Sequence, residues 1–159
     1  MTENRGAPYV HKLCTACAPI VLIALAGPVQ AGAAWDMFQA RCLDPYEHLT
    51  EPVTDGLAPQ PADQMRDAEL VFAAPDGLLL VLDAAPDDGN RACAVHALGA
   101  DMLDGAYLAW VDEVTQRQIY VPDAGMLVSD EWIEPQVHVE ASIDGAGAVY
   151  RVLETDLES

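Results

Sequence analysis

The stretch Ala68–Leu98, AELVFAAPDGLLLVLDAAPDDGNRACAVHAL, predicts three short strands joined by two turns, around which we expect the rest of the chain to fold. Pro75–Gly77 and Pro86–Asn90 carry the turn signals, because Pro fixes φ while Gly and Asn tolerate positive φ. Between these turns, Leu78–Leu82 is a continuous apolar run, which is typical of a strand with neighbours on both sides. We therefore expect a sheet with this stretch at its centre.

Downstream of these strands, the chain predicts its clearest helix. Apolar residues recur there at helical spacing and form a single stripe, with Asp101 as the expected N-cap. The stripe consists of Met102, Leu103, Ala106, Tyr107, Trp110, Val111 and Val114. Ile119–Val121 is a candidate short strand after the helix, and the pattern of Gly125–Glu134 is ambiguous.

The C-terminal part of the chain predicts a hairpin. Apolar residues alternate with polar ones from Val137 to Ile143, and a Gly-rich turn leads into a returning strand at Ala148–Glu154. Arg151 is costly to bury without a partner, so its neighbours Tyr150 and Val152 should face the core.

Two turns fit this choice of faces, because opposed residues of an antiparallel pair share a face. An Asp144-Gly145 turn sets His138 opposite Arg151, whereas a Gly145-Ala146 turn sets Glu140 there. We favour the second turn, because a carboxylate then lies opposite the guanidinium. That register also pairs Val139 with Val152 and Ala141 with Tyr150.

The segment Ala33–Cys42 predicts a short amphipathic helix that ends at Asp44-Pro45, because the residue before Pro avoids helical geometry. Around Cys42-Leu43-Asp44-Pro45 the chain resembles small uncharacterised secreted proteins of alphaproteobacteria, in which such a helix leads into Cys-Leu-x-Pro. The resemblance covers about a dozen residues, and it implies a compartment but no activity. The following Tyr46–Gln64 lacks periodicity and predicts an extended surface connection, with His48 as a solvated loop residue.

Together these elements predict an α+β fold with two layers. We expect a mainly antiparallel sheet of about five strands, one long helix packed on one face, and the short N-terminal helix.

Residues 1–31 have the pattern of a secretory signal peptide. Ala18–Gly27 is an apolar run too short to span a bilayer, and Val29-Gln30-Ala31 fits the cleavage rule. The expected mature chain, 32–159, is a single acidic domain of 128 residues in the periplasm or outside the cell. Cys14 and Cys17 are then removed with the signal peptide.

Cys42 and Cys93 remain after cleavage. In an oxidising compartment such a pair predicts a disulfide, since neither residue has a Cys or His neighbour at zinc-site spacing. A redox-active or metal-binding pair is the alternative.

The charge of the chain is strongly negative, −19 for the whole sequence and −20 after loss of residues 1–31. Such a charge repels nucleic acid and anionic membranes, and it favours either a basic protein partner or a salty medium. We expect a monomer with no nucleic-acid partner and no membrane association after cleavage.

No nucleotide-binding, metalloprotease or hydrolase motif is present in the sequence, and no cofactor is expected. The sequence thus favours a non-enzymatic binding or interaction module of unknown ligand. The alternative is a small metal-dependent or hydrolytic enzyme that uses His96 and His138, which alternation places on the open face of the sheet, with nearby carboxylates.

Overall fold

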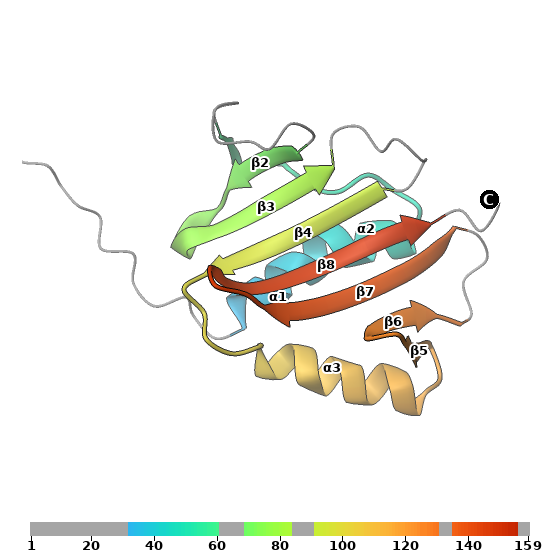
Figure 1. Ribbon diagram of the computed structural model, residues 1–159. Helices are drawn as coiled ribbons and strands as arrows, with labels where there is room; N and C mark the ends of the chain where they lie inside the picture. The colour runs from blue at the N-terminus through green and yellow to red at the C-terminus, as the bar shows by residue number, and fades with distance from the viewer. Residues whose placement is uncertain (1–31, 61–68, 84–90, 131–134, 156–159) are drawn as a thin grey trace, which may run out of the picture.

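The computed structural model describes residues 32–60, 69–83, 91–130 and 135–155. The expected signal peptide and the turn at Pro86–Asn90 lie outside these residues. The fold is α+β, as the sequence predicts, with helices on one side of a large antiparallel sheet (Figure 1). No described helix is long and apolar enough to cross a membrane.

The described strands form one sheet of eight, rather than the expected five or so, in the order β1-β2-β3-β4-β8-β7-β6-β5. All neighbouring strands are antiparallel. Their bounds are β1 Ala58–Pro59, β2 Glu69–Ala73, β3 Leu78–Asp83, β4 Arg91–Leu98, β5 Tyr120–Asp123, β6 Met126–Ser129, β7 Gln136–Ile143 and β8 Gly147–Thr155. The predicted three strands of Ala68–Leu98 are therefore confirmed as β2, β3 and β4.

The strand that the sequence left undecided is β6, which forms a tight hairpin with β5. Ala124 and Gly125 make the two-residue turn, with φ of 47° and 91°. Turns with two positive φ values usually contain Asn-Gly or Asp-Gly. Because Ala occupies the first position here, the sequence pattern did not predict this hairpin. β5 contains Pro122 and β1 ends in Pro59, as is tolerated in the outermost strands of a sheet.

The N-terminal helical segment does not end at Pro45, and this corrects the sequence prediction. It runs through α1 (Ala33–Phe38), a π-helical turn η1 (Gln39–Leu43) and α2 (Asp44–Glu47). Proline has no N–H for the carbonyl of Arg41, but that carbonyl accepts a hydrogen bond from Val53 N at 3.0 Å instead. Tyr46, expected in a surface connection, is consequently buried in the core.

The long helix is α3, Gly105–Gln116, and it begins later than predicted. Asp104, not Asp101, is the N-cap, since its carboxylate accepts a hydrogen bond from Ala106 N at 2.9 Å. The backbone N–H of Asp104 donates to the hydroxyl of Tyr150 at 2.7 Å, which fixes the start of the helix against β8. Met102 precedes the helix and is 72% exposed, so it does not belong to the apolar stripe.

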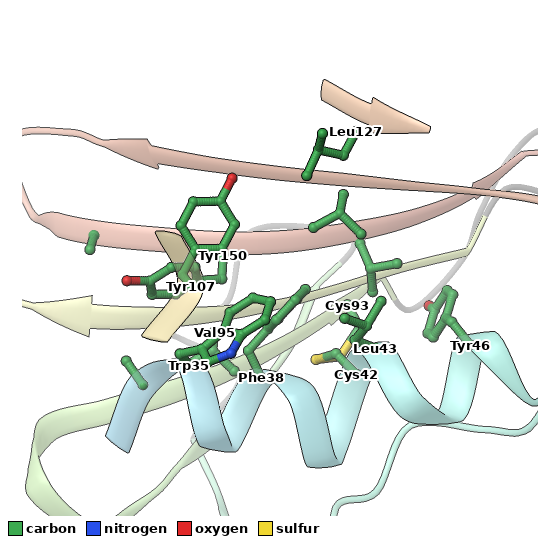
Figure 2. Close-up of a cluster of buried hydrophobic side chains, with 14 of the residues drawn as sticks. Trp35, Phe38, Cys42, Leu43, Tyr46, Cys93, Val95, Tyr107, Leu127 and Tyr150 are labelled. Atoms are coloured by element: carbon green, nitrogen blue, oxygen red, sulfur yellow. A yellow bond between two sulfur atoms is a disulfide. The ribbon is translucent and has the colours of Figure 1, made fainter. Parts of the chain in front are cut away.

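Aromatic rings join the helices to the sheet. The ring of Trp35 in α1 lies 5.1 Å from Tyr107, 5.0 Å from Trp110 and 5.8 Å from Tyr150, measured between centroids. Figure 2 shows three of these rings, Trp35, Tyr107 and Tyr150, between the helical segment and the strands. Such pairs add to the stability gained from burying the rings themselves.

Cys42 of η1 and Cys93 of β4 lie at disulfide distance. Both residues are fully buried. The pair therefore attaches the helical segment to the centre of the sheet, as the sequence predicts.

Candidate functional site

Alternation divides the sheet into a face covered by helices and an opposite face, which we call the open face. Leu80, Val95, Val139, Tyr150 and Val152 point into the helix-covered core and are at most 1% exposed. Their sequence neighbours must point the other way, because successive side chains of a strand alternate. His96 of β4, Glu140 and Ser142 of β7 and Arg151 of β8 thus lie on the open face.

The open face contains a groove of about 340 Å³ across β3, β4, β8 and β7. Buried Ala94 and half-buried Val81 and Val149 give it an apolar floor. The described lining also contains three carboxylates, one guanidinium and one imidazole. The lining residues are Val81, Asp83, Ala92, Ala94, His96, Glu140, Ser142, Asp144, Val149 and Arg151.

One row of paired residues crosses the middle of the groove. Glu140 is opposite Arg151, and Arg151 is opposite Ala94. The Arg151 guanidinium lies 3.5 Å from the Glu140 carboxylate, and their side chains are 44% and 38% exposed. A pair this open to water is worth little to stability, so its two groups can rearrange toward a ligand at small cost.

Asp144 stands at the hairpin end of the groove. Its carboxylate accepts hydrogen bonds from the backbone N–H groups of Ala146 at 2.7 Å and Gly147 at 2.9 Å. These two bonds, and more weakly the charge of His96, lower the pKa of Asp144 below its usual value. Asp144 is therefore a fixed negative charge at neutral and mildly acidic pH.

The turn that presents Asp144 depends on Gly147. A Cβ added there would lie 2.1 Å from the carbonyl oxygen of Ala97, and φ at this position is +154°. Only glycine permits this close approach of β8 to the end of β4.

His96 of β4 and His138 of β7 both lie on the open face, but the register does not bring them together. His96 is opposite Val149 and His138 is opposite Leu153, four residues farther along β8. With two strand spacings between β4 and β7, their Cα atoms are roughly 16 Å apart. That is too far for one metal ion to bind both, and no cluster of three His, Cys, Asp or Glu suited to a metal occurs among the described residues.

His48 lies away from the groove, at the end of α2. Its Nδ1 is 2.7 Å from the carbonyl oxygen of Asp44, and the residue is exposed. The ring therefore caps a helix end, a role that the sequence pattern did not reveal.

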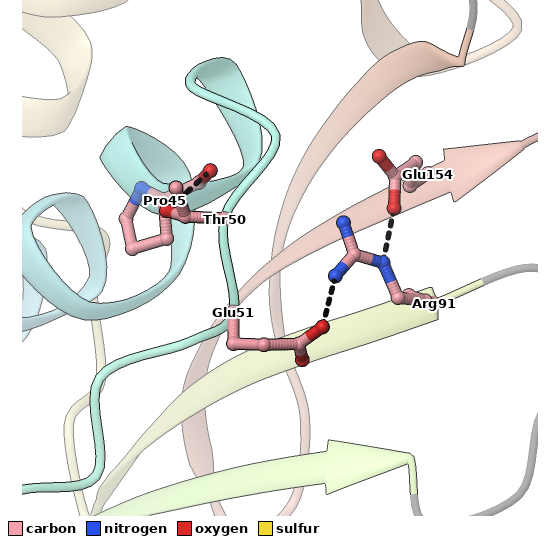
Figure 3. Close-up of polar contacts among 5 residues, drawn as sticks. All are labelled: Pro45, Thr50, Glu51, Arg91 and Glu154. Atoms are coloured by element: carbon pink, nitrogen blue, oxygen red, sulfur yellow. Dashed lines mark hydrogen bonds and ion pairs between the residues drawn. The ribbon is translucent and has the colours of Figure 1, made fainter.

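A second polar cluster escaped the sequence analysis and is shown in Figure 3. Arg91 at the start of β4 hydrogen-bonds Glu154 of β8 and lies 2.9 Å from the Glu51 carboxylate. Its guanidinium also stacks 5.0 Å from the ring centroid of Tyr46. Burial, outweighing the nearby Arg91, raises the pKa of the Tyr46 phenol far above its usual value.

Glu47 and Tyr120 form a third polar contact that the sequence did not predict. The Tyr120 hydroxyl donates to a Glu47 carboxylate oxygen at 2.8 Å, which joins α2 to β5. Burial raises the pKa of Glu47, although the hydrogen bond from Tyr120 opposes that shift. This contact belongs to the core side of the sheet and leaves the groove as the candidate site.

Comparison with known proteins gave no match to a family model, a curated protein or a solved structure.

Proposed function

We propose that the chain is a secreted or periplasmic binding module, without catalytic activity, whose open face takes a basic partner. The observation that carries the proposal is the groove, which has an apolar floor and an excess of carboxylates. A location outside the cytoplasm follows from the signal-peptide pattern, and the buried Cys42–Cys93 pair is compatible with it.

Charge complementarity supports a basic partner. The groove lining holds Asp83, Glu140 and Asp144 against Arg151 alone, which leaves two negative charges when His96 is neutral. The whole chain carries −19, so its field attracts cations to the same groove over a longer range. Apolar floor residues can contact the methylene stem of a Lys or Arg side chain while the carboxylates bind its charged end.

Binding of a defined basic peptide tests the proposal. We would measure the affinity of acetyl-(Lys-Gly)₄-amide by isothermal titration calorimetry, with protein made from the full-length gene and acetyl-(Gln-Gly)₄-amide as the neutral control. Alternate residues of an extended peptide share a face, so all four lysines can point toward the groove. We expect binding of the lysine peptide only, weakened as NaCl is raised.

Three single substitutions locate the site. Glu140→Gln removes a groove carboxylate and should weaken binding, whereas Arg151→Gln removes the one guanidinium among the described lining residues and should strengthen it. Asp112→Asn makes the same charge change as Glu140→Gln on the exposed surface of α3, away from the groove, and is the matched control. Equal effects of the Glu140 and Asp112 substitutions would contradict a groove site, and failure of the lysine peptide to bind would contradict the basic partner.

A further inference from the structure

We propose that His96 makes the open-face groove sensitive to pH, so that a cationic ligand binds tightly when the imidazole is neutral and is released when it is protonated. This inference rests on the proposed function. It adds a regulatory role for one residue of the site.

His96 lies in the groove, and the register sets apolar residues directly opposite it on both neighbouring strands. It is opposite Leu79 on β3 and Val149 on β8, and Val149 is in turn opposite Ser142 on β7. The residue is half-buried, and its side chain lines the groove. A charge on this ring therefore lies where the ligand's own charge would lie.

Four charged groups share the groove with His96, each from a different element. They are Asp83 of β3, Glu140 of β7, Arg151 of β8 and Asp144 of the β7–β8 turn. Glu140 and Arg151 face each other as an ion pair, and Asp144 interacts electrostatically with His96. His96 is the one imidazole among the described lining residues, and imidazole is the side chain that typically changes its charge between pH 5 and 8.

The sign of the effect follows from these charges. Neutral His96 leaves the lining with two net negative charges, and protonated His96 leaves it with one. A unit positive charge within one groove of a bound ammonium should weaken binding by about threefold to tenfold under partial solvent screening. Affinity should thus be high at pH 7.5 and low at pH 5.5.

The experiment measures binding of acetyl-(Lys-Gly)₄-amide at pH 5.5 and 7.5 to protein made from the full-length gene. We expect wild-type protein to bind about threefold to tenfold more weakly at pH 5.5. His96→Gln should bind equally at both pH values, and His96→Lys should bind weakly at both. His138→Gln is the matched control, because it removes an imidazole from the same face but outside the groove, and it should keep the wild-type pH dependence.

The outcomes separate this inference from the proposed function. Binding that is independent of pH in wild type, or an unchanged pH dependence in His96→Gln, would overturn the role of His96 while the basic partner stands. Absence of binding at both pH values would overturn both. Circular dichroism at each pH shows whether every variant is folded. His96→Lys tests the same charge effect in a second way, because it places a positive charge at this position at both pH values.

Discussion

Arg91 donates a hydrogen bond from its Nε to the carboxylate of Glu154, and this pair joins the first residue of β4 to the end of β8. The side chain of Glu154 is only 7% exposed, whereas that of Arg91 is 28% exposed. Because the same guanidinium contacts Glu51 and the ring of Tyr46, one residue connects the helical segment to the sheet. Among the described contacts, Arg91 is the charged partner of the buried Glu154 carboxylate.

Replacing Arg91 with Met should lower the free energy of unfolding by about 3 kcal/mol, because it leaves a buried carboxylate without its partner. Urea denaturation at pH 7 measures this loss. Glu51→Gln removes the exposed partner and should cost less than about 1 kcal/mol. The double variant Arg91→Met with Glu154→Leu should regain most of the lost stability, since no buried charge remains. An equal loss in the single and the double variant would show that packing rather than charge is responsible.

The start of α3 gives a second prediction, which tests the corrected cap. Asp104→Ala removes the carboxylate that accepts a hydrogen bond from Ala106 N, and it should cost about 1 kcal/mol of stability. Asp101→Ala makes the same chemical change three residues earlier, outside the helix, and should have an effect below about 0.5 kcal/mol. Urea denaturation of both variants decides between the two caps, and a larger loss for Asp101 would restore the original prediction.

The C-terminal hairpin shows how far the sequence could be taken. The cost of burying Arg151 predicted which residues of β8 face the core, and the favourable pair with Glu140 predicted the register: Glu140 is opposite Arg151, and Val139 is opposite Val152. Asp144 N donates to the Gly147 carbonyl at 2.9 Å, which closes the predicted Gly145-Ala146 turn. Ile143, expected to face the core, is 45% exposed because it lies in the last pair before the turn, at the end of the sheet.

Other features depended on tertiary contacts that no local pattern contains. Pro45 remains helical because Val53, eight residues later, replaces the missing donor to the Arg41 carbonyl. The cap of α3 shifts to Asp104 because Tyr150 of β8 binds its N–H. For the candidate site, alternation placed His96 on the open face, but only the strand order placed it in the same groove as Glu140 and Arg151 and away from His138.

The Cys42–Cys93 pair gives a third prediction. Native protein should show neither thiol to an alkylating reagent, since both residues are fully buried at disulfide distance, and reduction under denaturing conditions should expose both. Cys42→Ala should lower stability by about 2–5 kcal/mol, because the bond closes a long loop with a sequence separation of 51. Mass spectrometry of alkylated protein gives the thiol count, and alkylation of native protein at Cys42 or Cys93 would contradict the bond.

Glu47 gives the last prediction, which concerns pH. Burial raises the pKa of Glu47 in the folded protein, although Tyr120 donates a hydrogen bond to its carboxylate and thereby opposes the shift. A folded-state pKa above the unfolded value means that this group favours folding at low pH, where it is protonated, and that this contribution is lost as pH rises through the folded pKa.

Glu47→Gln keeps an oxygen acceptor for Tyr120 but removes the charge. The variant should therefore gain stability relative to wild type between pH 4 and pH 7, measured by urea denaturation at each pH. Glu113→Gln on the exposed surface of α3 is the matched control and should show no such gain. A relative loss of stability in Glu47→Gln as pH rises would instead mean that the hydrogen bond from Tyr120 outweighs the cost of burial.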